Sequence, residues 1–578
     1  MRRFTGILTA GALSAALFLA APSFSFQAQA AAVAEKPQSQ YQQNFVQQKL
    51  IQNTSFGKVQ GVEKDGALLW EGIPYGKPPV GELRWRAPQD PEPWLGVKET
   101  VKENPAIQLT RDGVVGSDDS LNLTVYRPAS AEANLPVLYY IHGGNNQTGV
   151  STEFEATDFA RKTNSIVVTV NHRLDILGFL NLPALKTGDP LEDSGNYALL
   201  DLHKALQWTI DNIANFGGNP NNITISGFSA GGRDVLAILT SPVFKGKFQQ
   251  AISFSGGLTI ADPIASQKVF AAKLAPLAVA DKVKSSLREA EAWLLQDNQE
   301  VRDYLYSLPS SRLVSALGNG NLRLAAFPHL FADGTVLPSE AFATKNFNSV
   351  PLILLASDSE FSMFSPRDPY FAAAQANGWK DEEARKELAF TIKYGSLLYE
   401  YANVEDVVKR IGKAYRAPIY ALKIAWGTDP ALVGEEMARL WGSHHGIFLP
   451  LLIEKPRLSS QLYPQAFSSP GVADLSAKLQ QYVSNFLWQG DPNDQGLPSW
   501  PKWDNKPSEL ILNAGKDKAL ISIASPHTSY QEIIKSIQAD RSIKEEAKQK
   551  IIREILNGRW FSQDLDQAFH TPGLWLQK

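Results

Sequence analysis

The chain contains no cysteine among its 578 residues. This absence excludes a cysteine nucleophile, a thiolate metal site and any disulfide. The fold must therefore be held by a large core alone, which a chain of this length can build. The net charge is also small, −3, and no long run of like charges occurs. We therefore expect no nucleic-acid partner.

Long apolar runs are missing too, except at the N-terminus. There, an apolar run follows Arg2 and Arg3, and small residues lead up to Ala30. This pattern predicts a signal peptide over residues 1–30, cleaved near Ala30, and a periplasmic or secreted protein. An uncleaved membrane anchor is the alternative. No other uncharged stretch is long enough to span a bilayer, so we expect no stable membrane insertion of the mature chain.

Three further segments follow the predicted signal peptide. Residues 31–55 are polar and rich in glutamine, which predicts a loosely ordered leader. Residues 56–520 are predicted to form the main domain. It begins with a hairpin at Asp65-Gly66, a dipeptide that favours a two-residue turn. Residues 521–578 read as amphipathic helix, which we expect to pack on the domain.

Short apolar runs rich in Val, Ile and Tyr recur through the main domain, as buried parallel strands require. They are residues 135–144, 164–174, 222–226, 249–257, 350–360, 417–426 and 508–515. Helical patterns separate them, such as residues 195–218, and segments 260–325 and 370–415 read as helical insertions that could form a cap. This alternation predicts an α/β fold with a mostly parallel central sheet flanked by helices.

The stretch TISGFSAGG, residues 224–232, places Ser229 between two glycines. The pattern alone has low specificity, and a small-residue turn without chemistry is the alternative interpretation. Its context is more informative, because a predicted strand ends directly before Ser229 and a predicted helix begins directly after it. A nucleophile elbow requires such a sharp strand-to-helix turn with small neighbours. The helix also directs its N-terminal N–H groups toward the serine oxygen.

A serine nucleophile needs a histidine base and an acid that orients this base. Of the eight histidines in the chain, only His329, His444 and His445 lie after Ser229 and before the tail. His444 and His445 lie in a glycine-bounded loop, as a catalytic base would. Candidate acids are Asp358 and Glu360, which follow a buried strand at the sheet edge where α/β proteins place their sites.

The stretch FGGNPNNITISGFSAG, residues 216–231, resembles the serine signature of the type-B carboxylesterase/cholinesterase family of α/β-hydrolases. The resemblance extends over about residues 57–515. It includes GIPYGKPPVGELRWRAP, SDDSLNLTVYRP, IHGG, VNHRLDILGFL, GNYALLDLHKALQW, AISFSGG and FADGTVLP. It implies an α/β-hydrolase fold and ester hydrolysis through a Ser-Glu-His triad.

Each family position can be transferred to one residue of this chain. Ser229 matches the nucleophile, Glu360 the acid and His445 the base, with Asp358 and His444 as the respective alternatives. Ser255 resembles a family serine that hydrogen-bonds near the acid. The resemblance further implies an oxyanion hole formed by backbone N–H groups. These belong to Gly144, Asn145 and Ala230.

Several positions depart from the family pattern. Asn145 stands where the family usually has a third glycine, and asparagine tolerates left-handed backbone best among the other residues. Phe228 replaces an acidic residue before the serine, and Phe361 replaces a glycine after the acid. If both rings and the neighbouring His444 line the substrate pocket, the pocket is apolar and a cationic choline ester is disfavoured. The sites of two family cysteines, Ala106 and Ser120, have changed together.

We therefore predict a serine carboxylesterase that acts on neutral short-to-medium acyl or aryl esters through an acyl-enzyme. It would need no cofactor and no metal, and its partner would be a small-molecule ester. A catalytically inactive adhesion or interaction protein is the main alternative, since the family contains such proteins. A hydrolase of amides, carbamates or polymeric esters is another.

Overall fold

The computed structural model describes residues 49–318, 320, 327–453, 458–504, 506–556 and 567–568. The predicted signal peptide and most of the predicted leader lie outside these ranges. Within residues 46–578 the chain forms one compact unit. None of the helices in the described ranges is both long and apolar enough to cross a bilayer.

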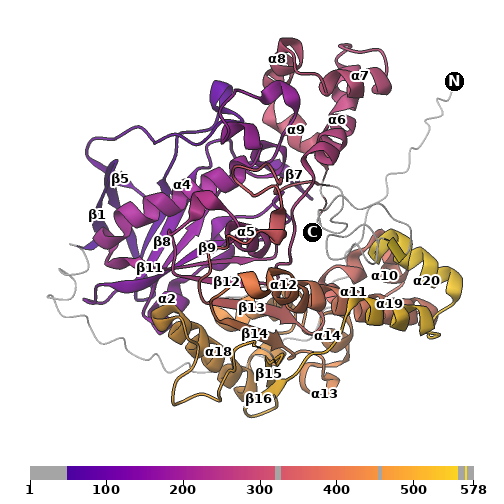
Figure 1. Ribbon diagram of the computed structural model, residues 1–578. Coiled ribbons are helices and arrows are strands. Elements are labelled where there is room, and N and C mark those ends of the chain that lie inside the picture. Colours follow the sequence, from indigo (N-terminus) through magenta and orange to yellow (C-terminus); the bar gives the residue numbers. More distant parts are fainter. Residues whose placement is uncertain are drawn as a thin grey trace, which may run out of the picture. The chain divides into compact units, whose positions relative to one another are not determined.

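The central element is an 11-stranded sheet (Figure 1). Its strands are β3 (Val62–Lys64), β4 (Ala67–Pro74), β8 (Asn122–Pro128), β9 (Leu135–Ile141), β10 (Ile166–Val170), β11 (Gly218–Phe228), β12 (Gln250–Phe254), β13 (Leu352–Ser357), β14 (Ile419–Ile424), β15 (Glu509–Ala514) and β16 (Ala519–Ala524). They lie in the order β16-β15-β14-β13-β12-β11-β9-β10-β8-β4-β3. The strands from β15 to β10 in this order are parallel, and antiparallel strands form both edges. This confirms the predicted mostly parallel sheet.

Helices cover both faces of this sheet. In the first half of the chain they are α2 (Thr157–Thr163), α3 (Asp175–Gly178), α4 (Tyr197–Asn212), α5 (Ala230–Ile238), α6 (Pro263–Ala280), α7 (Leu287–Leu294), α8 (Gln299–Ser307) and α9 (Ser310–Leu317). In the second half they are α10 (Ala372–Ala376), α11 (Glu382–Asn403), α12 (Glu405–Ile411), α13 (Pro430–Val433), α14 (Glu435–Leu440), α15 (Phe448–Leu452), α16 (Leu458–Leu462), α17 (Pro464–Phe467), α18 (Pro470–Gln489), α19 (Tyr530–Ala539) and α20 (Glu545–Ile551).

The alternation of side chains along β9 shows the two layers. Leu138 and Tyr140 belong to a buried cluster that also contains residues of α2 and α18. Tyr139 points to the opposite face, where its hydroxyl donates a hydrogen bond of 2.8 Å to the carbonyl of Leu202 in α4. Successive strand residues face opposite sides of a sheet, so a strand that is buried on both faces is apolar throughout.

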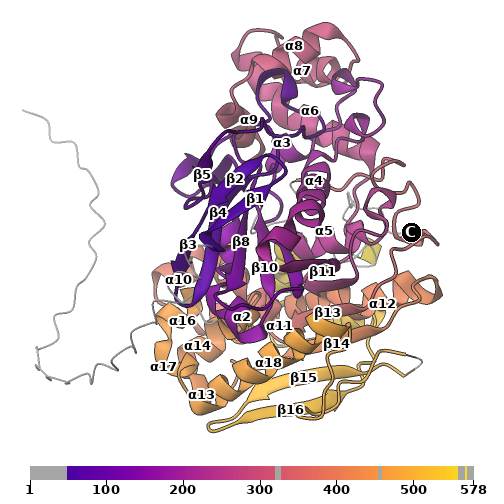
Figure 2. The same cartoon turned by 90° about the vertical axis from the view of Figure 1, so that its left-hand side faces the viewer.

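The two predicted insertions form two separate groups of helices. Figures 1 and 2 show α6 to α9 together, and α9 packs against α3. Figure 1 shows α10 and α11 beside α19 and α20. On α11, the hydroxyl of Tyr394 donates to the carbonyl of Ser536 at 3.0 Å and to the carboxylate of Asp540 at 2.7 Å.

The structure corrects both ends of the predicted main domain. Strand β1 (Ile51–Thr54) lies inside the segment predicted to be a loosely ordered leader, and it pairs with β2 (Gly57–Gln60). With β5 (Val97–Glu99) they form a small sheet beside β4 (Figure 2). At the other end, β16 occupies residues where we expected a helix. The side chains of β16 alternate between half-buried and exposed over most of its length, as expected of an edge strand. It pairs on one side, with β15.

The predicted hairpin at Asp65-Gly66 is confirmed. Lys64 pairs with Ala67 across the turn between β3 and β4. Asp65 and Gly66 have φ values of 50° and 76°, as a two-residue turn with both central residues left-handed requires. The strands β6 (Gln108–Thr110) and β7 (Gly113–Val115) also form a hairpin.

Candidate active site

Ser229 lies in a strained turn between β11 and α5. Its backbone angles are φ 56° and ψ −110°, a conformation that residues other than glycine rarely adopt. The Ser229 N–H donates to the carbonyl of Phe254 at 2.8 Å, and the Ser229 carbonyl accepts the N–H of Arg233 at 3.0 Å. These bonds continue the sheet on one side and start the helix on the other. The side chain is half-buried, so it can meet a substrate.

The neighbours of Ser229 have to be small because three backbone segments meet there. A Cβ atom on Gly227 would lie 2.3 Å from the Gly231 carbonyl carbon. One on Gly231 would lie 2.2 Å from the carbonyl oxygen of Ile141, where β9 ends. The start of α5 therefore packs directly against the loop after β9, which contains the predicted oxyanion residues.

Glu360 and His445 are hydrogen-bonded to each other. The imidazole Nδ1 of His445 lies 2.5 Å from Oε2 of Glu360, and both side chains are buried. The other carboxylate oxygen, Oε1, accepts the Ser255 hydroxyl at 2.6 Å and the Ser357 N–H at 2.8 Å. Because a carboxylate can only accept, Nδ1 of His445 carries the proton, and Nε2 presents a lone pair.

The other candidate bases and acids lie elsewhere. The Nδ1 atom of His444 faces the Gly442 carbonyl at 3.3 Å, and its ring packs edge-on against Trp441. Burial lowers the pKa of His444 to about 3. Nε2 of His329 lies 3.1 Å from the guanidinium of Arg233. Asp358 is exposed. Among these candidate bases and acids, the described contacts therefore join His445 to Glu360 and join no other base to an acid.

Phe228 brings the serine turn next to His445. Its ring centroid lies 4.6 Å from that of the imidazole, at an interplanar angle of 35°. Two more aromatic rings surround the same imidazole, Phe364 at 5.2 Å and Tyr399 at 5.5 Å. Since Ser229 directly follows Phe228, the predicted nucleophile and the predicted base lie in the same small region.

The structure corrects the expectation that Phe228, Phe361 and His444 line an apolar pocket. Phe361 is fully buried, and a Cβ atom on Gly395 of α11 would lie only 2.1 Å from its ring. The glycine therefore leaves the space that this ring occupies. His444 and Phe228 are exposed by only 4% and 8%, and Phe228 covers His445. Phe361 thus presents no surface to a substrate, whereas His444 and Phe228 each keep a small exposed fraction, as His445 does.

The loop after β9 presents backbone N–H groups beside Ser229. Among the described residues, the N–H groups of Gly144, Asn145 and Ala230 donate no hydrogen bond within the protein. The N–H of Gly143, in contrast, is occupied by the carboxylate of Glu153 at 2.9 Å. Asn145 adopts φ 60°, the left-handed backbone that asparagine tolerates. Three N–H groups without a partner among the described residues therefore lie on the two segments that meet at the serine turn.

Two buried carboxylates lie behind this loop. Burial raises the pKa of Asp175 to about 7, against hydrogen bonds from Gln147 and Ile176 that lower it. Burial also raises the pKa of Asp234 to about 7, against the hydrogen bond from Asn146. Near neutral pH each group is therefore partly protonated, which limits the cost of burying these hydrogen-bond acceptors.

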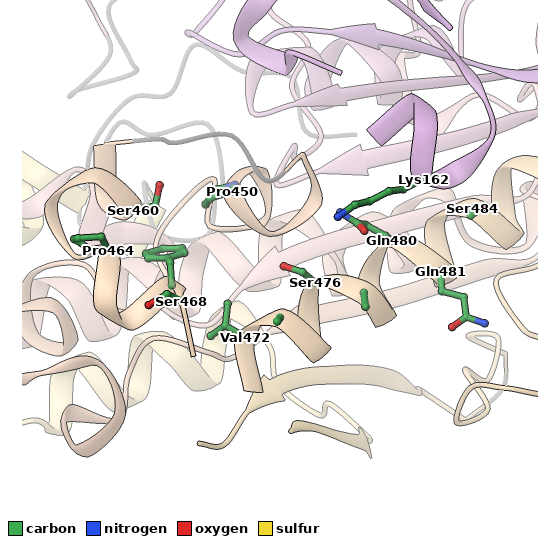
Figure 3. A pocket seen from close by; sticks show the side chains of 13 residues that line it. Lys162, Pro450, Ser460, Pro464, Ser468, Val472, Ser476, Gln480, Gln481 and Ser484 are labelled. Carbon is green, nitrogen blue, oxygen red and sulfur yellow. The ribbon is translucent and has the colours of Figure 1, made fainter. Parts of the chain in front are cut away.

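A separate pocket of about 830 Å³ lies along α18 (Figure 3). Figure 3 shows Ser476, Gln480 and Ser484 of this helix on one side, with Lys162 and Pro450 across from them. It contains none of the predicted site residues. In the described ranges, no three His, Asp or Glu side chains lie close enough together to hold a metal ion.

Sequence comparison bears on the same residues. A model described as "Carboxylesterase family" matches residues 48–421, which is more than half of the chain. The chain belongs to the carboxylesterase family. It is a carboxylic ester hydrolase by family, as the sequence motifs predicted. The matched range contains Ser229 and Glu360 and ends before His445.

Two relatives illustrate how far the similarity extends. Carboxylesterase 1D of Rattus norvegicus is 31% identical over 536 residues, which cover 81% of this chain and 90% of that protein. The medium-chain fatty acyl-CoA hydrolase precursor of Anas platyrhynchos is 28% identical over 544 residues, covering 84% and 93%. This carboxylesterase thus resembles its relatives over most of their length.

Solved structures of the family have the same fold. A PNB esterase is 26% identical with a TM-score of 0.64, covering 82% of this chain and 97% of its own. A carboxylesterase of Geobacillus stearothermophilus is 25% identical, also with a TM-score of 0.64, covering 82% and 98%. The predicted α/β-hydrolase fold is therefore confirmed.

Two residues beside the loop after β9 were not predicted from the sequence. Arg233 and Asp234 are buried in α5 and hydrogen-bond to the side chains of Asn145 and Asn146. A signal was present, because two adjacent charges interrupt an otherwise apolar helix directly after the serine turn. Buried charges are rare unless they are paired, so such a pair indicates a partner across the fold.

Proposed function

We propose that this carboxylesterase cleaves esters through a triad of Ser229, Glu360 and His445. Nε2 of His445 takes the proton of the Ser229 hydroxyl, whose oxygen attacks the ester carbonyl carbon. The imidazolium then returns the proton to the leaving alcohol, and an acyl-enzyme remains. Water attacks the acyl-enzyme by the same route and releases the carboxylic acid. The observation that carries this proposal is the hydrogen bond between Nδ1 of His445 and Glu360.

The N–H groups of Gly144, Asn145 and Ala230 would stabilise the negative oxygen of the tetrahedral intermediate. All three are unoccupied among the described residues, and the Ala230 N–H lies at the N-terminus of α5. Each donor aimed at a developing oxyanion lowers the barrier by about 3–4 kcal/mol. Ser255 and the Ser357 N–H hold the acid in one orientation, which keeps the imidazole in the productive tautomer.

A fluorophosphonate probe tests the proposal. It reacts with a serine only when a base and an oxyanion hole activate it, so we expect stoichiometric labelling of the peptide that contains Ser229. Mass spectrometry locates the label, and Ser229→Ala serves as the control without a nucleophile. An unlabelled but folded wild-type protein would instead favour the inactive interaction protein.

For the substrate we propose neutral short-to-medium acyl or aryl esters. The described side chains around His445 are the rings of Phe228, Phe364 and Tyr399, and position 228 carries no carboxylate that would attract an ammonium group. We expect p-nitrophenyl butyrate to be hydrolysed with a higher kcat/KM than butyrylthiocholine, measured side by side with acetate and octanoate esters. A preference for the choline ester would contradict this assignment, and activity on amides alone would favour the amidase alternative.

A further inference from the structure

Two consecutive residues of the loop after β9 have left-handed backbone. Asn145 and Asn146 adopt φ values of 60° and 56°. This region is unfavourable for residues other than glycine, and two such residues in succession persist only where surrounding contacts hold them. Both side chains are almost completely buried, so these contacts come from the protein itself.

Two consecutive residues of α5 provide these contacts. The guanidinium Nη2 of Arg233 donates to Oδ1 of Asn145 at 3.0 Å. The carboxylate Oδ1 of Asp234 accepts the side-chain amide of Asn146 at 2.8 Å. Arg233 and Asp234 are exposed by only 2% and 1%, so both bonds lie in the protein interior. A hydrogen bond is stronger there than in bulk water.

Arg233 is itself held in place. Its Nη1 lies 3.1 Å from Nε2 of His329. Because a guanidinium only donates, Nε2 must be the unprotonated nitrogen, and Nδ1 donates to the Phe327 carbonyl at 2.9 Å. Burial holds the pKa of His329 well below its usual value, so the ring stays a neutral acceptor. His329 therefore holds the Arg233 guanidinium in place independently of Asn145.

The opposite side of Asn145 is fixed as well. Its side-chain N–H donates to Oε1 of Gln147 at 3.0 Å, and this oxygen also accepts the N–H of Gly320 at 2.9 Å. The Gln147 amide donates to the carboxylate of Asp175 at 2.8 Å. Both polar ends of the Asn145 side chain are thus occupied, so this side chain adds no donor to the site. Its backbone N–H has no partner among the residues that the structure describes.

We propose that Arg233 is a positioning residue for the oxyanion hole. By holding the Asn145 side chain, it fixes the direction of the Asn145 backbone N–H, and Asp234 supports it through Asn146. The inference rests on the proposed function, in which this N–H stabilises the oxyanion. A donor contributes fully only when it lies at hydrogen-bond distance from the oxygen as it becomes charged. Loss of Arg233 therefore lowers kcat and leaves KM almost unchanged.

A double-mutant cycle of Arg233→Met and Asn145→Gly tests this inference with p-nitrophenyl butyrate. Glycine adopts left-handed backbone freely and lacks the oxygen that accepts from Arg233. We expect Arg233→Met to lower kcat about 30-fold with KM changed less than about threefold, since the donor is misaligned but present. Asn145→Gly alone should have a similar effect. When Asn145→Gly is already present, adding Arg233→Met should lower kcat by less than about threefold more.

Arg127→Met is the matched control. Arg127 is as buried as Arg233, but it donates to backbone carbonyls such as that of Phe216 at 2.9 Å, on another part of the fold. Its loss should lower Tm and leave kcat unchanged. The inference would be overturned if Arg233→Met lowered kcat by the same factor with and without the Asn145→Gly substitution. It would also be overturned if Arg233→Met lowered kcat no more than Arg127→Met does.

Two outcomes remain separable. If circular dichroism shows that Arg233→Met does not fold, the Asn145→Gly variant alone tests the inference. An unchanged kcat in Asn145→Gly then overturns it. Full activity in Ser229→Ala would instead overturn the proposed function, whatever the cycle shows.

Discussion

Replacing His445 by alanine is expected to lower kcat about 10⁶-fold, the loss seen when a serine hydrolase is deprived of its base. Ser229 would then have no acceptor for its proton, since the other candidate ring, His444, is bound to the Gly442 carbonyl and packs on Trp441. KM for p-nitrophenyl butyrate should stay nearly constant, because the base acts mainly in the transition state. Stopped-flow and steady-state assays would measure both quantities.

The adjacent histidine provides the control for this experiment. We expect His444→Ala to reduce kcat less than about tenfold, through packing alone. Added imidazole should restore part of the activity of His445→Ala, because the removed ring leaves a slot between Phe228, Phe364 and Tyr399. If His444→Ala has the larger effect, the assignment of the base is wrong.

Replacing Glu360 by glutamine is expected to lower kcat about 10⁴-fold. The Ser255 hydroxyl and the Ser357 N–H both donate to the same oxygen, Oε1. The amide oxygen of glutamine must therefore stay there, and its NH₂ group must face Nδ1 of the imidazole. Nδ1 can then only accept, so the proton moves to Nε2, and His445 can no longer take a proton from the serine.

The stability of Glu360→Gln separates this effect from unfolding. Glutamine has nearly the same shape and removes a buried charge, so Tm should be equal to or above that of the wild type. Glu360→Asp keeps the acceptor and should retain more activity than Glu360→Gln. If Glu360→Gln retains more than about a tenth of the wild-type kcat, then the acid does not act by setting the tautomer of His445 in this enzyme.

Much of the fold could be predicted from local patterns. Continuous apolar runs predicted the parallel strands from β9 to β15, because a strand covered by helices on both faces has no polar side. The ends were predicted less well. Strand β16 (ALISIA) is a half-exposed edge strand, and an apolar run this short does not by itself distinguish a strand from a helix. Strand β1 (IQNT) is mostly polar and pairs with β2.

The candidate site, too, was predicted in part from local patterns. The serine turn could be predicted from residue types alone, since Gly227 and Gly231 are required wherever backbone segments approach this closely. The sequence also reduced the choice of base to three histidines. The family resemblance assigned His445 rather than His444 as the base, and in the folded chain it is His445 that lies against Glu360.

Only the tertiary structure decided that Phe361 fills the space at Gly395 and that Arg233 meets Asn145. The physical reason is distance along the chain. Residue type and periodicity report local backbone and burial, whereas the direction of a side chain depends on segments that only the folded packing brings together.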